Sequence, residues 1–109
     1  MVFATQIRQK GSNEVRNVAV SYADKLESGE LLTGTPTITE VTSSDLTLSN
    51  KIVSTGALTI NGVSASAGQA ITFTVAAGTS STVYTIRIQC GTDATNPQTF
   101  DDHVKLEVL

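Results

Sequence analysis

The sequence predicts an all-β fold, an antiparallel sandwich of about seven strands, from three features of its pattern. The chain has 109 residues, of which 17 are threonine and 11 are serine, and the threonines stand mainly between aliphatic residues. Because threonine is β-branched and stiff at χ1, it suits the solvent face of a sheet better than a helix. Several segments also alternate between apolar and polar residues, as strands with one buried face do. Turn residues separate these segments about every 8–12 residues, a spacing typical of a sandwich or a barrel.

The first part of the chain predicts an arm, a strand and a turn. Residues 1–14 have weak periodicity and are predicted to form a flexible arm that orders against a neighbouring chain. Residues 18–22 are typical of a strand. The stretch 23–29 is compatible with a helix and ends in a glycine suited to the left-handed conformation. It is too short for a stable helix, so we expect one turn that carries Leu26 over the end of the sandwich.

The middle of the chain predicts short strands joined by tight turns. Residues 30–32 and 35–41 supply one strand or a pair of strands. Pro36 cannot donate to a β-ladder, so it is expected at a strand start or at a sheet edge. The dipeptide Asn61-Gly62 is typical of a tight hairpin turn. Three further short strands are predicted before this turn, at residues 46–48, 51–53 and 57–60.

The clearest alternation lies in the last third of the chain, in residues 71–75, 83–90 and 103–108. Because antiparallel sheets are the ones that commonly keep one solvated face, we expect antiparallel hairpins among these three segments. The hydroxyl groups of Tyr22 and Tyr84 are expected at the rim of the sandwich. The apolar members of the three segments are expected in the core, namely Ile71, Phe73, Val75, Tyr84, Ile86, Ile88, Cys90, Val104, Leu106 and Val108.

Length and composition restrict the class of protein. The length suits one domain, assigned to residues 15–109, and the absence of tryptophan leaves a mainly aliphatic core. A net charge of −3 and scattered basic residues disfavour nucleic acid as a partner. The single cysteine, Cys90, allows no intramolecular disulfide and indicates a reducing cytoplasm. No signal peptide and no apolar stretch of the ~20 residues that a membrane helix needs are recognised, so we expect no membrane partner.

The sequence contains three candidates for a chemical site, and each lacks the residues that its chemistry needs. His103 is the one histidine, and a proton carrier or zinc ligand needs partners that the fold must supply. Cys90 would need a base to act as a nucleophile, and its place in the alternation predicts a buried apolar side chain. Neither a phosphate-binding glycine loop nor a Gly-x-Ser-x-Gly elbow occurs, so we expect no catalytic residue, cofactor or metal. Four oxygen-bearing residues are near in sequence but match no calcium loop, namely Asp93, Asn96, Asp101 and Asp102.

The order of the segments carries a family resemblance. A polar start leads into the run from Val18 to Leu32, a threonine-rich middle follows, and Ala77-Gly78-Thr79 precedes the strands at 83–88 and 104–108. Over most of residues 15–108 this layout resembles the small immunoglobulin-like virion proteins of tailed bacteriophages, of the fibre-to-tail adaptor type. The chain departs from them in lacking the tryptophan that often follows the leucine-glycine turn and recurs in the next strand. Tyr22 and Ile38 would fill that space.

The resemblance implies a structural role. Several copies would sit on the symmetric tail or connector of a virion and give fibres or neighbouring tail proteins a docking surface, after synthesis in the bacterial host cytoplasm. Sandwich edges and an N-terminal arm are suited to docking by strand addition, and contacts repeated around a ring bind multivalently. Two other readings stay open, a capsid decoration or head-completion protein and a bacterial surface- or carbohydrate-binding module. The scarcity of aromatic residues counts against the last, and the lack of a catalytic set counts against an enzyme.

Overall fold

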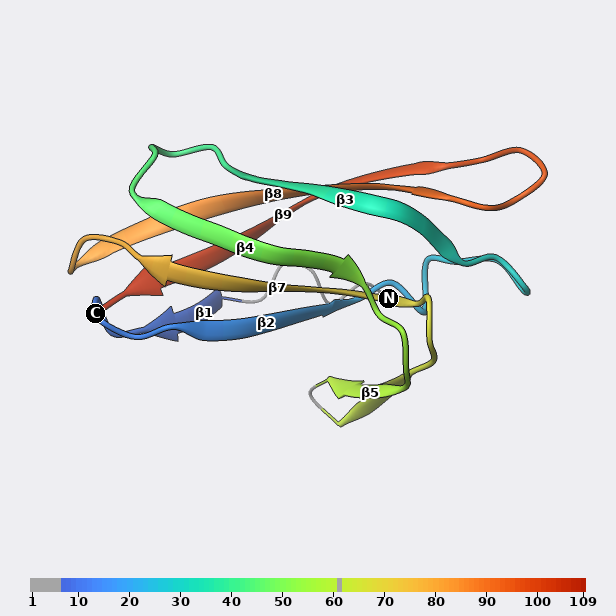
Figure 1. Cartoon of the computed structure of the whole chain (residues 1–109), viewed down its shortest axis with the longest axis horizontal. Helices are drawn as coiled ribbons and strands as arrows, with labels where there is room; N and C mark the ends of the chain where they lie inside the picture. Colours follow the sequence, from blue (N-terminus) through green and yellow to red (C-terminus); the bar gives the residue numbers. More distant parts are fainter. Residues whose placement is uncertain (1–6, 61) are drawn as a thin grey trace.

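The computed structural model describes residues 7–60 and 62–109, which form two layers of β-sheet (Figure 1). No helix occurs in this part of the chain, and therefore none that could cross a membrane. The all-β prediction is thus confirmed. The two ranges contain nine strands: β1 (Ile7–Lys10), β2 (Arg16–Ser21), β3 (Leu32–Glu40), β4 (Leu46–Val53), β5 (Leu58–Ile60), β6 (Val63–Ala65), β7 (Ala70–Ala77), β8 (Thr82–Thr92) and β9 (Thr99–Val108).

Seven of these strands make the two main sheets, with the orders β1-β9-β8-β3 and β2-β7-β4, and β5 and β6 form a separate hairpin. In the first sheet, β8 and β9 are an antiparallel hairpin, β3 pairs antiparallel with β8, and β1 pairs parallel with β9. The strands predicted at 83–90 and 103–108 are confirmed, and β9 begins four residues earlier than expected, at Thr99. Pro36 lies in β3, an edge strand, where a missing amide hydrogen is tolerated.

In the second sheet, β7 is the central strand and pairs antiparallel with β2 and β4. The strands predicted at 46–48 and 51–53 are a single strand, β4, so the predicted break between them is wrong. The register shifts between Ser49 and Ile52, and Asn50 there has a φ of 52°. A β-bulge of this kind inserts an extra residue without ending the strand, which period-two alternation alone does not reveal.

The hairpin expected between 71–75 and 83–90 is also wrong, because β7 and β8 belong to different sheets. The turn at 78–81 carries the chain from one layer to the other, with Gly78 at a φ of 104°. A Cβ atom on Gly78 would lie 3.0 Å from Leu46 Cδ2 and 3.0 Å from Val108 Cγ2. Glycine therefore permits both the left-handed backbone and the close approach of the two layers at this point.

The core lies between the two sheets and consists of the inward-facing members of each alternating strand. Every apolar residue predicted for the core from the C-terminal segments is buried, at 5% exposure or less. Leu26 packs against this core from the turn after β2, as predicted. The buried cluster comprises Val18, Val20, Tyr22, Leu32, Ile38, Ile71, Phe73, Val75, Tyr84, Ile86, Ile88, Cys90, Val104, Leu106 and Val108.

The predicted hairpin turn at Asn61-Gly62 is supported by the strands around it. Ile60 pairs with Val63, so two residues connect β5 to β6, and Gly62 has a φ of 80°. Asn61 itself lies outside the described residues. The hairpin covers one end of the second sheet, where Ile60 and Ala65 form a small cluster with Ala70.

The N-terminal segment predicted to be an arm divides into two parts. Residues 1–6 lie outside the described residues, whereas β1 runs along β9 with Lys10 opposite Val108. Lys10 is buried, and its Nζ donates a hydrogen bond of 2.7 Å to the Gly11 carbonyl oxygen. Ordering of residues 1–14 against a neighbouring chain stays a prediction.

Candidate functional site

His103 and Cys90, two of the three candidates for a chemical site, lie on opposite sides of the first sheet. His103 projects from the outer face of β9, directly opposite Arg87 of β8. Cys90 is in the core, as predicted, with its Sγ 3.5 Å from the Thr33 carbonyl oxygen. Burial raises the pKa of the Cys90 thiol, which disfavours the reactive thiolate.

The four residues considered for calcium are not brought together. Asp101 receives two hydrogen bonds from the Arg87 guanidinium, at 2.9 and 2.6 Å. Asp102 faces inward and pairs with Lys25 at 3.0 Å, while Asp93 accepts a bond from the Leu31 amide at 2.8 Å. Across residues 7–60 and 62–109, no group of three His, Cys, Asp or Glu side chains could hold a metal ion.

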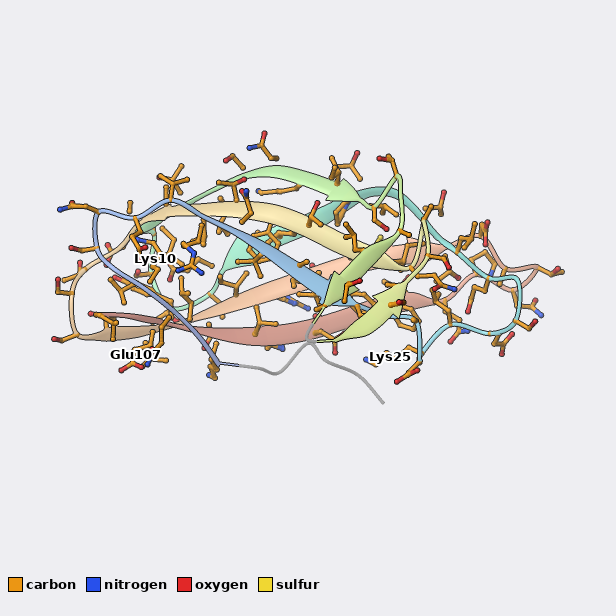
Figure 2. All side chains as sticks on the ribbon, turned by 90° about the horizontal axis from the view of Figure 1, so that it is seen from below. Lys10, Lys25 and Glu107 are labelled. Carbon is orange, nitrogen blue, oxygen red and sulfur yellow. The ribbon has the colours of Figure 1, made fainter. Side chains whose placement is uncertain are left out.

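Asp102 and Lys25 belong to a cluster that sequence analysis missed. The rings of Tyr22 and Phe100 stack with centroids 5.4 Å apart, and Lys25 Nζ lies 5.9 and 5.4 Å from their centroids. Figure 2 shows Lys25 toward the opposite end of the molecule from Lys10 and Glu107.

The Tyr22 hydroxyl is buried and makes no hydrogen bond of good geometry, so its predicted place at the rim is wrong. Burial, and then the nearby charge of Asp102, raise the pKa of this phenol.

A hollow lies at this end of the sandwich, between the turn before β3 and the loop that joins β8 to β9. It has a volume of about 580 Å³. Glu30 is buried at its base, where it accepts hydrogen bonds from the Thr92 hydroxyl at 2.6 Å and from Gln98. These bonds, together with one from the Glu27 amide, lower the pKa of Glu30. Glu30 thus ties the two loops together. The lining residues are polar or small and include no aromatic ring: Glu27, Ser28, Gly29, Glu30, Asp93, Ala94, Thr95, Asn96 and Gln98.

The outer face of the first sheet is charged. Beside the Arg87–Asp101 pair, Lys105 Nζ donates to the Thr85 hydroxyl at 2.6 Å, and Gln9 Nε2 donates to Glu107 at 2.8 Å. Together with His103, these residues give this face five ionisable side chains on β8 and β9. Such mixed, mutually paired charges are typical of a surface that stays in water.

The outer face of the second sheet differs sharply, because no ionisable side chain of β2, β4 or β7 points from it. Lys51 turns to the other side of β4, where it lines a hollow with Leu46 and Leu48, and Arg16 stands opposite the inward-facing Val75. We call this surface the uncharged face. Its outward side chains are Asn17, Ala19, Thr47, Ser49, Asn50, Ile52, Thr72, Thr74 and Ala76.

Hydrogen bonds hold the centre of the uncharged face in place across three strands. Asn50 Nδ2 donates to the Thr74 hydroxyl at 3.1 Å, and that hydroxyl donates to Asn17 Oδ1 at 2.9 Å. A hollow of about 360 Å³ lies over this row. Ile52 lines the hollow and is 50% exposed, so a large apolar side chain stands beside a depression in an otherwise small-residue surface.

The sheet edges are poorly suited to the strand addition expected from the sequence. The bulge in β4 and the register shift in β3, which also contains Pro36, interrupt two of the edge strands. β1 has only four residues, and the β5-β6 hairpin contacts β2 near Ala19. Proteins use such devices to prevent edge pairing. A sheet face is therefore the better candidate for docking.

The comparisons with known proteins identify no relative. No family model, no curated protein and no solved structure matches the chain.

Proposed function

We propose that this protein is a non-catalytic docking domain that binds other proteins in a multi-copy assembly. The observation that supports this function best is the difference between the two outer faces. One carries five ionisable side chains, and the other carries none on its three strands. Depletion of charged residues distinguishes the centre of protein interfaces from the rest of the surface. The uncharged face is then the surface that meets a partner.

We also propose that the sandwich is of the immunoglobulin type. With β2, β3, β4, β7, β8 and β9 taken as strands B to G, the two sheets have the B-E-D and C-F-G groupings of that fold. Tyr84 near the start of β8 accepts a hydrogen bond from the Thr79 amide at 2.7 Å. This contact is the kind made by the tyrosine corner of such domains. β1 departs from the constant-type pattern, because it pairs with β9 instead of β2.

The layout of the sequence supports a more specific proposal, a structural virion protein of a tailed bacteriophage. In this role it is a tail adaptor that docks fibres or neighbouring tail proteins. A small sandwich with one charged and one uncharged outer face suits such repeated docking, because weak contacts gain strength when several copies bind together. A capsid decoration or head-completion protein would use the same surface.

The experiment is to ask where the protein is found. Reading frames for portal, terminase and tail proteins beside this one, and detection of the chain by mass spectrometry in purified particles, are the expected results. A chain absent from particles, or a gene among transporters or glycosidases, overturns the virion role. The binding of the Thr74→Lys variant to these particles is then compared with the binding of the Thr85→Lys variant. Thr74 lies on the uncharged face and Thr85 on the charged face. Loss of binding is expected only for Thr74→Lys, and loss only for Thr85→Lys rejects the uncharged face.

A further inference from the structure

We propose that the partner on the uncharged face is a second copy of this chain, and that the two copies pack face to face about a two-fold axis. This inference rests on the proposed docking function and names its first partner. Three properties of the uncharged face carry it: its charge, its shape and its size.

The charge of the chain favours this face for contact between identical copies. The net charge is −3, so two copies repel one another wherever carboxylates approach each other. The charged face would take the ionised side chains of both copies out of water, including Asp101 and Glu107 with their basic neighbours Arg87 and Lys105, which is costly. The large hollow at the loop end would bring together Glu27, Glu30 and Asp93 of each. The uncharged face adds no like-charge pair, because its outward side chains are neutral at every pH.

The shape of the face is suited to its own copy. In a two-fold contact the same patch serves on both sides, so a protrusion must meet a depression on the identical surface. Ile52, which is 50% exposed, lines one side of the 360 Å³ hollow that Asn17, Thr72 and Thr74 also line. An axis passing beside this hollow places Ile52 of each copy over the hollow of the other. The hydroxyl and amide groups beneath already bond to one another, so covering them leaves fewer unpaired polar groups.

The size of the face predicts a weak dimer. The longest strands of this sheet have eight residues each, so the face measures roughly 27 Å by 14 Å, or roughly 400 Å², from standard strand spacings. The β5-β6 hairpin covers part of it. Stable interfaces bury about 800 Å² on each partner. We therefore expect a reversible dimer that forms at high protein concentration and gains strength where other contacts hold the copies together.

Sedimentation equilibrium of the full chain, from about 10 μM to about 1 mM, tests the proposal. The wild type is expected to shift from monomer toward dimer as concentration rises. Ile52→Lys is expected to weaken the dimer by about tenfold or more, because it places two like charges in the interface. The matched control is Val83→Lys, since Val83 is 52% exposed on the charged face, compared with 50% for Ile52. Equal melting temperatures show that both variants fold.

Crosslinking gives a second readout. Thr72→Cys borders the hollow, and Thr85→Cys has similar partial exposure on the charged face. A short bismaleimide is expected to join two Thr72→Cys chains and not two Thr85→Cys chains. A wild type that stays monomeric at 1 mM, or Ile52→Lys and Val83→Lys that behave alike, overturns the dimer. A monomeric chain found in virions rejects the dimer alone, whereas a dimer absent from virions rejects the virion role alone.

Discussion

At the scale of single residues, the two core tyrosines use their hydroxyl groups in opposite ways. Both rings are buried, and the alternation of residues 83–90 predicts this for Tyr84. The Tyr84 hydroxyl accepts a hydrogen bond from the Thr79 amide and donates one of 3.0 Å to Asp45. The Tyr22 hydroxyl makes none of good geometry. Alternation predicts on which side of a strand a ring lies, but the partners of its hydroxyl come from turns that the pattern does not place.

Removing each hydroxyl should therefore have different effects. Tyr84→Phe leaves the Thr79 amide without its partner and removes the shorter of two hydrogen bonds to Asp45, so it is expected to lower the free energy of unfolding by about 1–2 kcal/mol. Tyr22→Phe removes a buried hydroxyl that lies near Asp102 but makes no hydrogen bond of good geometry, so it should be nearly neutral or stabilising. Urea denaturation of both variants measures the difference. Equal destabilisation of the two would contradict these hydrogen-bond assignments.

The acidic residues near the C-terminus show what sequence reasoning could have found. Consecutive residues of a strand face opposite sides, so Asp101 and Asp102 cannot ligate one ion from within a regular strand. The alternation predicts a strand that begins at His103, after these two residues. β9 in fact begins at Thr99, which sends Asp101 outward to Arg87 and Asp102 inward to Lys25. Pairing with β8 determines that β9 begins at Thr99. A local pattern of apolar and polar residues does not contain this partner strand.

At the scale of elements, the sequence predicts strands well where one face is buried and the other wet. Segments 71–75, 83–90 and 103–108 are of this kind. The prediction fails where the outcome depends on pairing between strands that are distant in the sequence. The division of β7 and β8 between two sheets depends on which strands are already paired, and the continuity of β4 through its bulge depends on β7.

Gly78 at the crossing between the sheets offers a sharp test of this architecture. Gly78→Ala forces a side chain into a backbone with a φ of 104° and into contact with Leu46 and Val108. We expect it to lower the free energy of unfolding by about 1–3 kcal/mol. Gly56→Ala is the control, because nothing lies within 4 Å of its Cβ position and its φ is not positive. Thermal melts should separate the two, and an unchanged melting temperature for Gly78→Ala would count against the crossing.

β1 allows a test of the predicted arm. It pairs only with β9, at the edge of the sheet, so it should open locally more often than the central strand β8. Native-state hydrogen exchange of the dilute monomer is expected to show protection at residues 8–10 that is weaker than in β8 but stronger than in the turn at 11–14. Protection no greater than in that turn would mean that β1 forms only against a neighbouring chain.

At the scale of the whole molecule, the pairing of distant segments creates a surface that no local pattern contains. The uncharged face gathers residues from β2, β4 and β7, which are separated by long stretches of chain. In each strand alone, a threonine or asparagine between apolar residues is an ordinary solvent position. Their meeting on one sheet, with Lys51 turned away by the bulge, distinguishes this side of the sandwich from the other.

Four ionisable groups in the described part of the chain predict that stability is lost at both low and high pH. The pKa values of Glu30 and Asp101 lie below their usual 4.5 and 3.8, because Thr92 and Arg87 respectively bond to their charged forms. Their stabilisation is complete above the usual values and is lost as pH falls through the lower folded ones. The pKa values of Cys90 and Tyr22 lie above 9.0 and 10.0, chiefly because of burial. The unfolded chain ionises first there, so stability falls as pH rises above about 9.

Each loss can be reduced separately. Glu30→Gln keeps the shape of the side chain but not its titration, so it should lessen the loss of stability below pH 4.5 to the part due to Asp101 and leave the alkaline limb unchanged. Cys90→Ala should lessen the alkaline loss to the part due to Tyr22 and leave the acid limb unchanged. Urea denaturation from pH 2.5 to 10.5 measures both limbs, and each variant serves as the control for the other. If Glu30→Gln keeps the full acid dependence, the bonds from Thr92 and Gln98 do not hold the carboxylate in solution, and the two loops at that end are not tied by it.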